Sequence, residues 1–270
     1  MKNNILLIGD TVSACRVALS AMEPVLLKKG CSVYTLPTAI VSNTFGYRKV
    51  AQVSTGSYVA DSLAAWEEMG FDFDNIYVGY VTDKAQADAI ENYCRIKSAQ
   101  GKKIFLDPIM GEDCHLYYGM GEENAEFHRQ ITAVAHYIMP SYTEAAFLTG
   151  RDYTQKPDSR ETVCSVIREL MDIGAENVVV TSCIIDGQDY TAGYDREAEK
   201  FFFLPCDHVP VKVAGTGDLF AAVFIAQILA GQKTETAARN AMDEVRELVI
   251  ANKDNEDTIR GITIEKYITE

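Results

Sequence analysis

The sequence predicts an α/β protein whose central, mostly parallel β-sheet is flanked by helices on both faces. Short apolar runs of strand length alternate with longer amphipathic runs of helix length along most of the 270 residues. In such an alternation, right-handed crossovers connect parallel strands and lay the helices on the faces of the sheet. The chain shows no internal repeat, low-complexity tract or linker. We therefore expect residues 1–270 to form a single domain.

The sequence patterns predict the following strands and helices, taken in chain order. The run from Asn4 to Gly9 is apolar at successive positions, as in a strand buried on both faces. A helical pattern follows over about 14–29, and Gly30 stands where a helix would end. A polar, β-prone stretch at 184–204 predicts an antiparallel edge or hairpin. The other expected strands are 31–36, 76–80, 103–107, 137–139 and 177–181, and the other expected helices are 57–69, 84–100, 123–135, 158–173, 217–231 and 234–252.

Charge and cysteine content exclude several classes of protein. The formal net charge of −14 argues against a nucleic-acid partner or an anionic membrane surface, because both attract Lys and Arg. The seven cysteines contain no Cys-x-x-Cys pair, which indicates reduced thiols and neither a disulfide framework nor a zinc site. No signal peptide and no apolar run long enough to cross a bilayer is found. We expect a cytoplasmic protein.

The glycine-rich segment Gly215-Thr216-Gly217-Asp218 leads directly into the apolar run Leu219–Leu229. Glycines allow a tight turn and a close approach to a ligand, and the free N–H groups at a helix start bind anions. In that setting Asp218 would remove a proton from a hydroxyl group while the amides hold the phosphoryl group that the hydroxyl attacks. The alternative is that Asp218 only caps the helix. No P-loop and no dinucleotide-binding glycine pattern is present.

Other polar residues also stand at the predicted ends of strands. In open α/β sheets, ligands bind at the carboxyl edge of the strands, so these residues predict one shared site. They are Asp10 after the first strand, Tyr80 after the third, Asp107 after the fourth, the segment Ser141–Glu144, Thr181 with Ser182, and Gly215–Asp218.

Several segments, taken in this order, resemble the ribokinase-like superfamily and, within it, the pyridoxal and pyridoxamine kinases of vitamin B6 salvage. The resemblance runs from the first strand to about residue 250, and the glycine-rich motif alone marks the superfamily. The segments are LPTAIVSNTFGY (36–47), VGYV (78–81), DPIMG (107–111), MPSYTEAAFLTG (139–150), VVVTS (178–182) and AGTGDLFAAVF (214–224).

The resemblance assigns roles for phosphoryl transfer to individual residues. It implies that Asp218 is the catalytic base and that Gly215, Thr216 and Gly217 form the anion hole. It also implies that Asp107, Thr181 and Ser182 bind ATP, and that Glu144 and Asp107 hold Mg²⁺, partly through water. Each residue has a structural alternative: a turn before Pro108 for Asp107, a helix-dipole contact for Glu144, and a plain strand end for Thr181.

For the substrate side, the resemblance implies that Asp10, Thr44 and Tyr80 contact the pyridine, although Tyr80 could simply pack. Three positions depart from the family. Asp10 stands where many relatives carry Ser, Thr44 follows Asn43 where His is frequent, and Ser141 replaces the usual Asn. An ionised Asp only accepts hydrogen bonds, so Asp10 could recognise an amine or a ring N–H. The departures concern the choice of vitamer more than the reaction.

The resemblance thus implies ATP-dependent phosphorylation of the 5′-hydroxymethyl group of pyridoxamine, pyridoxal or pyridoxine. ATP and Mg²⁺ are the expected cofactors, a monovalent cation is a further candidate, and a homodimer is the expected assembly. Two alternatives stay open: a kinase acting on hydroxymethylpyrimidine or a sugar, and a non-catalytic ligand-binding homologue.

Overall fold

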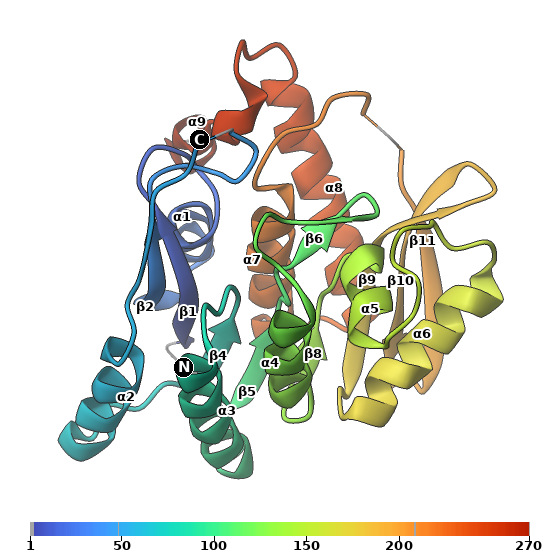
Figure 1. Cartoon of the computed structure of the whole chain (residues 1–270). Coiled ribbons are helices and arrows are strands. Elements are labelled where there is room, and N and C mark those ends of the chain that lie inside the picture. Colours follow the sequence, from blue (N-terminus) through green and yellow to red (C-terminus); the bar gives the residue numbers. More distant parts are fainter. Residues whose placement is uncertain (1–2, 48, 208, 270) are drawn as a thin grey trace.

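A nine-stranded sheet lies at the centre of the computed structural model, which describes residues 3–47, 49–207 and 209–269 (Figure 1). Its strands are β1 (Asn4–Val12), β2 (Ser32–Val41), β3 (Gln52–Ser54), β4 (Asn75–Val78), β5 (Lys103–Leu106), β8 (Tyr137–Ile138), β9 (Asn177–Ile185), β10 (Gln188–Asp195) and β11 (Lys200–Pro205). Their order is β11-β10-β9-β8-β5-β4-β1-β2-β3. The pairs from β2 through β9 are parallel, whereas β3, β10 and β11 pair antiparallel at the two edges. The expected fold class and the expected edge hairpin are confirmed.

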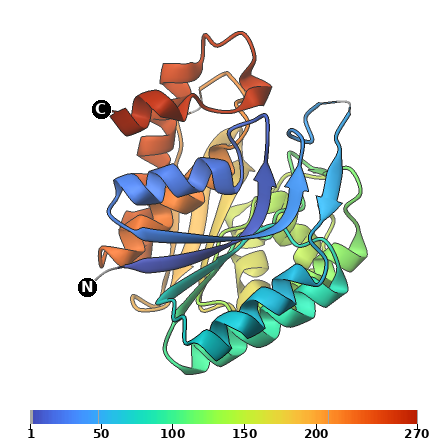
Figure 2. The ribbon, with the colours of Figure 1, turned by 90° about the vertical axis from the view of Figure 1, so that its left-hand side faces the viewer.

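Helices cover both faces of this sheet. Figure 2 shows this for the part of the sheet that contains β1 and β2. One face carries α2 (Tyr58–Met69), α3 (Lys84–Ala99), α4 (Glu122–Thr132), α5 (Tyr142–Leu148) and α6 (Arg160–Ile173). The other face carries α1 (Leu19–Lys28), α7 (Thr216–Leu229), α8 (Thr234–Asn252) and α9 (Ile264–Thr269). A short hairpin of β6 (Gly111–Glu112) and β7 (His115–Leu116) and a 3₁₀ turn at Thr258–Arg260 complete the elements.

The most apolar segments form the centre of both cores. In β1, Ile5 and Leu7 face the core under α7, whereas Leu6 and Ile8 face the core under α3, and all four are fully buried. This alternation is why a strand buried on both faces is apolar at every position. Helix α7 is buried almost all round, because it lies between the sheet, α1 and α8. Its start lies against the turn before α1, where a Cβ at Gly215 would meet Arg16 and Val17.

The strand order reverses at β1. The chain passes from β1 to β2 on one side of it and then returns to β4 on the other side. Ligands in open α/β sheets bind at such a switch point, outside the carboxyl ends of the strands. The end of β1, which contains Asp10, is therefore the place where this topology leaves room for a site.

The main differences from the expected elements are local. Helix α1 begins at Leu19, since the chain between Ser13 and Ala18 turns back and pairs with the end of β1. Strand β3, the β6–β7 hairpin and the short helix α9 were not expected from the pattern, and the start of α5 was considered only through the helix-dipole alternative for Glu144. In the part of the chain that the structure describes, we find no helix with both the length and the apolarity that a membrane crossing needs.

Candidate active site

Four carboxyl groups from different elements gather at the predicted edge of the sheet. Burial and then the charge of Asp218 raise the pKa of Asp10, which lies in β1. Burial and then the charges of Glu144 and Asp218 raise the pKa of Asp107, which follows β5. The groups lie close enough for the charge of Asp218 to act on Asp10 and Asp107, and for the charge of Glu144 to act on Asp107. The structure therefore brings together the acidic residues that the sequence predicted for one site.

Asp218 lies in the first turn of α7 and bonds across to another element. Its Oδ2 accepts a hydrogen bond of 2.8 Å from the backbone N–H of Ala18. Gly215 is the N-cap of α7, and no side chain caps this helix, so the capping alternative for Asp218 is wrong. Burial raises the pKa of Asp218 to about 6, against the effect of the Ala18 bond. A carboxylate with a pKa near neutral can accept a proton efficiently.

A side chain would have different consequences at the two glycines of the motif. Gly215 has φ +84°, and a Cβ there would lie 2.8 Å from the backbone oxygen of Arg16. A side chain at Gly217, in contrast, would meet no protein atom within 4 Å. The open space at Gly217 lets an anion approach the first N–H groups of α7, which have no partners within the helix. Thr216 stands between them as the first residue of α7.

Asp10 is a buried carboxyl group at the switch point. It is only 6% exposed, and the register of β1 against β2 shifts between Gly9 and Asp10. Burial and the charge of Asp218 raise its pKa to about 7. Within the described residues, Asp10 forms no ion pair with a Lys, Arg or His side chain. It lines a narrow hollow together with Ala18, Tyr77 and Tyr80.

Aromatic side chains form one wall beside Asp10. Tyr80 is buried, and its hydroxyl accepts a hydrogen bond of 3.0 Å from Nε2 of Gln52. The ring of Phe45 contacts Tyr80 edge-on at 6.1 Å and stacks with Tyr117 at 6.4 Å between centroids. Such rings can hold a flat heterocycle by its faces. Phe45 and Tyr117 were not predicted as site residues; the pattern of aromatic residues near motif segments was the only signal.

Thr44 adjoins this wall but its hydroxyl is directed elsewhere. It is buried, and its Oγ1 donates a long hydrogen bond of 3.5 Å to the backbone oxygen of Ile259. The side chain thus joins the segment after β2 to the 3₁₀ turn near the C-terminus. Its expected contact with a substrate stays a prediction.

Glu144 holds the loop after β5 to the start of α5. Its Oε1 accepts hydrogen bonds from the N–H groups of Met110 and Gly111, and its Oε2 accepts one from Ser141. The Ser141 hydroxyl in turn accepts from the N–H of Glu144, which completes a capping box. The sequence Ser-x-x-Glu is a readable signal for this motif. Burial still raises the pKa of Glu144 to about 7.

Asp107 is the better candidate for a direct metal contact. It is buried, and burial with the charges of Glu144 and Asp218 raises its pKa well above the usual range. A cation would relieve this repulsion, and carboxylate oxygens suit Mg²⁺. The described residues contain no group of three His, Cys, Asp or Glu that could hold a metal. Mg²⁺ in proteins takes one or two carboxylates plus phosphates and water, so Asp107, with Glu144 through water, fits that ion.

Thr181 and Ser182 lie beside the start of α5. Thr181 pairs with Ser141, and its N–H donates to the backbone oxygen of Pro140 at 2.9 Å. Ser182 is exposed and has φ +58°, an uncommon value for a residue with a side chain. The strand is irregular here, as the shifted register between β9 and β10 also shows. Both residues are thus presented at the same edge, although no contact identifies their ligand.

Ala18 is a site residue that the sequence did not reveal. It is the N-cap of α1 and has φ 52° and ψ −140°, a conformation that favours glycine. This conformation aims its N–H at Asp218. An alanine in an apparent helical pattern carries no signal for such a role.

The buried carboxyl of Asp10 makes a prediction for stability. Its pKa rises from 3.8 to about 7 on folding, so the folded protein binds the proton more tightly than the unfolded chain. The free energy of unfolding should therefore fall as the pH rises from about 4 to about 7. Asp10→Asn removes this effect and should stabilise the protein at pH 8 by up to about 4 kcal/mol, from three pKa units. Urea unfolding at pH 4 and pH 8 measures it.

The exposed Asp88→Asn variant in α3 is the matched control and should follow the wild type at both pH values. An Asp10→Asn protein that is no more stable than the wild type at pH 8 would show that Asp10 is not a strained, buried acid.

Comparisons with known proteins agree with the observed fold. A pyridoxine/pyridoxal/pyridoxamine kinase of Bordetella bronchiseptica is 27% identical over 244 residues, covering 86% of this chain and 83% of the relative. A structure from Bacteroides thetaiotaomicron, named as a candidate phosphomethylpyrimidine kinase and solved with pyridoxal, is 25% identical with a TM-score of 0.93 and covers 100% of this chain and 95% of that one. Pyridoxal kinase from Lactobacillus plantarum is 26% identical with a TM-score of 0.87, covering 99% and 95%. A family model described as phosphomethylpyrimidine kinase matches residues 25–260, and the chain belongs to that family.

Proposed function

We propose that this protein is a kinase that transfers the γ-phosphoryl group of ATP to the 5′-hydroxymethyl group of pyridoxal, pyridoxine or pyridoxamine. The observation that carries the proposal is the position of Asp218: a carboxyl group with a pKa of about 6 lies in the first turn of α7, at a helix start that no side chain caps. The names of the relatives add the substrate, since two of them are kinases of vitamin B6 compounds and a third was solved with pyridoxal.

Each site residue has its own proposed role in phosphoryl transfer. Asp218 accepts the proton of the substrate hydroxyl, held in place by the N–H of Ala18. The N–H groups of Thr216, Gly217 and Asp218 stabilise the charge on the transferred phosphoryl group. Asp107, and Glu144 through water, would hold Mg²⁺, which would supply further charge stabilisation on the nucleotide phosphates. Thr181 and Ser182 bind the nucleotide.

The substrate ring is proposed to lie against Tyr80 and Phe45 with Asp10 at its polar edge. Asp10 is half-ionised near pH 7 and has no cation beside it in the described structure. A protonated ring nitrogen or an aminomethyl group would hold it ionised and form a charge-assisted hydrogen bond. A neutral acceptor on the ring would instead bind its protonated form.

Two further proposals concern the assembly and its location. A homodimer is supported by Ile40 and Val53, which pair across β2 and β3 at the edge of the sheet and are 53% and 65% exposed. Exposed apolar pairs on an edge strand favour association. A cytoplasmic location is supported by the seven cysteines, all of which are free.

A substrate panel tests the proposed function. ADP release should be saturable with at least one of pyridoxal, pyridoxine and pyridoxamine, and should depend on Mg²⁺. The family name raises a second candidate, a hydroxymethylpyrimidine substrate, and turnover with that compound alone would replace the proposal. Turnover with a sugar alone would also replace it. Ligand binding without any ADP release would mean a non-catalytic homologue.

Replacing Asp218, the proposed base, gives a further prediction. Asp218→Asn should lower kcat by about 10²–10⁴-fold, because a general base contributes about that much. The dissociation constants of MgADP and the vitamer, measured by calorimetry, should change little. Asp88→Asn on the opposite face is the control and should keep full kcat. An Asp218→Asn enzyme with wild-type kcat would remove this residue from catalysis.

The pKa of Asp218 predicts the pH profile of the wild type. The ionised carboxylate is the active form, so kcat/KM should rise with pH through an apparent pKa of about 6. The pKa of the neighbouring Asp10 is about 7, so the ionisation of both groups contributes to the rise of kcat/KM with pH. Asp10→Asn should leave the midpoint near 6, because Asp10, with its higher pKa of about 7, is still largely protonated and uncharged where Asp218 titrates. A flat profile between pH 5 and pH 8 would contradict the assignment.

A further inference from the structure

The site has an excess of negative charge that a nucleotide would increase. Asp10, Asp107, Glu144 and Asp218 all have raised pKa values, and burial is the largest cause for each. The charge of Glu112 in β6 adds to the rise at Asp218. A magnesium ion cancels only part of the charge of ATP. Side chains that carry positive charge are therefore expected beside the phosphates.

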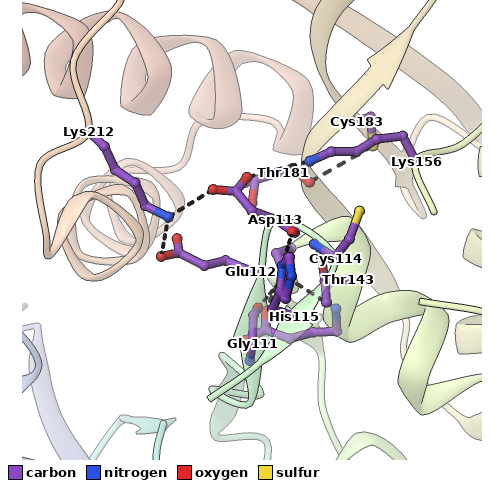
Figure 3. Close-up of polar contacts among 12 residues, drawn as sticks. Gly111, Glu112, Asp113, Cys114, His115, Thr143, Lys156, Thr181, Cys183 and Lys212 are labelled. Carbon is purple, nitrogen blue, oxygen red and sulfur yellow. Dashed lines mark hydrogen bonds and ion pairs between the residues drawn. The ribbon is translucent and has the colours of Figure 1, made fainter. Parts of the chain in front are cut away.

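Two lysines stand at this edge, on either side of the β6–β7 hairpin (Figure 3). Nζ of Lys212 lies 2.9 Å from Oε1 of Glu112 and 2.8 Å from Oδ2 of Asp113. Nζ of Lys156 lies 3.4 Å from Oδ1 of Asp113. The turn of the hairpin thus holds both lysines, with Asp113 between them.

Both lysines come from segments next to the proposed nucleotide residues. Lys212 stands three residues before Gly215, in the approach to α7. Lys156 precedes α6, and its charge acts on the thiol of Cys183, two residues after Thr181 in β9. Figure 3 shows Thr181 and Cys183 beside Lys156, across the hairpin from Lys212. The pair therefore flanks the region between the start of α7 and the end of β9.

The contacts at the hairpin turn can be exchanged without unfolding the hairpin. Its backbone is fixed at both ends, because Ser141 donates to the Gly111 oxygen at the base at 2.9 Å and the Cys114 N–H in the turn donates to Thr143 at 3.0 Å. The ion pairs at the turn are solvent-accessible, with 66% of the Lys212 side chain exposed and 55% of the Asp113 side chain. Exposed ion pairs are weak, whereas a phosphate offers a lysine more charge and more acceptor oxygens.

We propose that Lys212 and Lys156 bind the β- and γ-phosphates of the nucleotide, and that Glu112 and Asp113 hold the two lysines until the phosphates displace them. The inference rests on the proposed kinase function. It makes the hairpin carboxylates competitors of the nucleotide. Removing a lysine and removing its carboxylate partner must then have opposite effects on nucleotide affinity.

Calorimetric titration with MgADP and MgATP tests this competition. Lys212→Met should weaken both dissociation constants by about tenfold or more, since hydrogen bonds between charged groups contribute at least that much. Lys156→Met should weaken them in the same direction. Asp113→Asn keeps the size of the side chain and tolerates the φ of +50°, and should tighten binding by about 1.5- to 5-fold, the range of an exposed ion pair. Adenosine, which has no phosphate, should bind all variants equally.

Lys200→Met is the matched control, because Lys200 pairs with Glu235 away from the site and should leave every constant unchanged. If the ion pairs only support the fold, Asp113→Asn and Lys212→Met will both weaken binding, and the inference is wrong. Unchanged constants in both lysine variants would also overturn it, while the kinase proposal stands if the wild type turns over a substrate. A wild type that binds neither nucleotide would overturn both.

Discussion

The hydrogen bond from the Ala18 N–H to Asp218 is the contact on which the site depends. It joins the turn after β1 to the start of α7, two places that are 200 residues apart in the chain. The same turn is fixed from the other side, because Arg16 bonds the backbone oxygen of Arg260 and lies against Gly215 and Gly261. This turn thus sets the direction of the Asp218 carboxyl before any ligand arrives, as the proposed role of Asp218 as a base would require.

The turn that contains Ala18 and the buried carboxyl groups beside it lower the stability of the fold. Ala18 occupies a backbone region that costs a residue with a side chain about 1–3 kcal/mol. Burial raises the pKa values of the Asp10, Asp107 and Glu144 carboxyl groups, and the charges of neighbouring carboxyl groups raise those of Asp10 and Asp107 further. The apolar strand β1 and the buried helix α7 supply the surrounding stability. Strain and repulsion gathered at one edge of a well-packed sheet are typical of a site that a ligand and a cation complete.

The sequence predicted the architecture well where periodicity decides the structure. The short run Ile5–Ile8 is typical of a strand buried on both faces, and the longer apolar segment after Gly217 is typical of a buried helix. Resemblance to a family identified Asp218, and the structure gives the physical setting for it. Three features were out of reach or missed. The conformation of Ala18 has no sequence signal, the hairpin turn uses two non-glycine residues at positive φ, and the capping box of Ser141 and Glu144 was readable but not read.

A crystal structure with MgADP and a vitamin B6 compound bound would test the role of the turn that contains Ala18 most directly. Asp218 should keep its bond to the Ala18 N–H through one oxygen and place the other within about 2.6–3.2 Å of the 5′-hydroxymethyl oxygen, the reach of a general base. The β-phosphate should point toward the first N–H groups of α7. A complex in which the hydroxymethyl group lies beside another residue, or in which the Asp218 carboxyl has turned away from the cleft, would contradict the assignment.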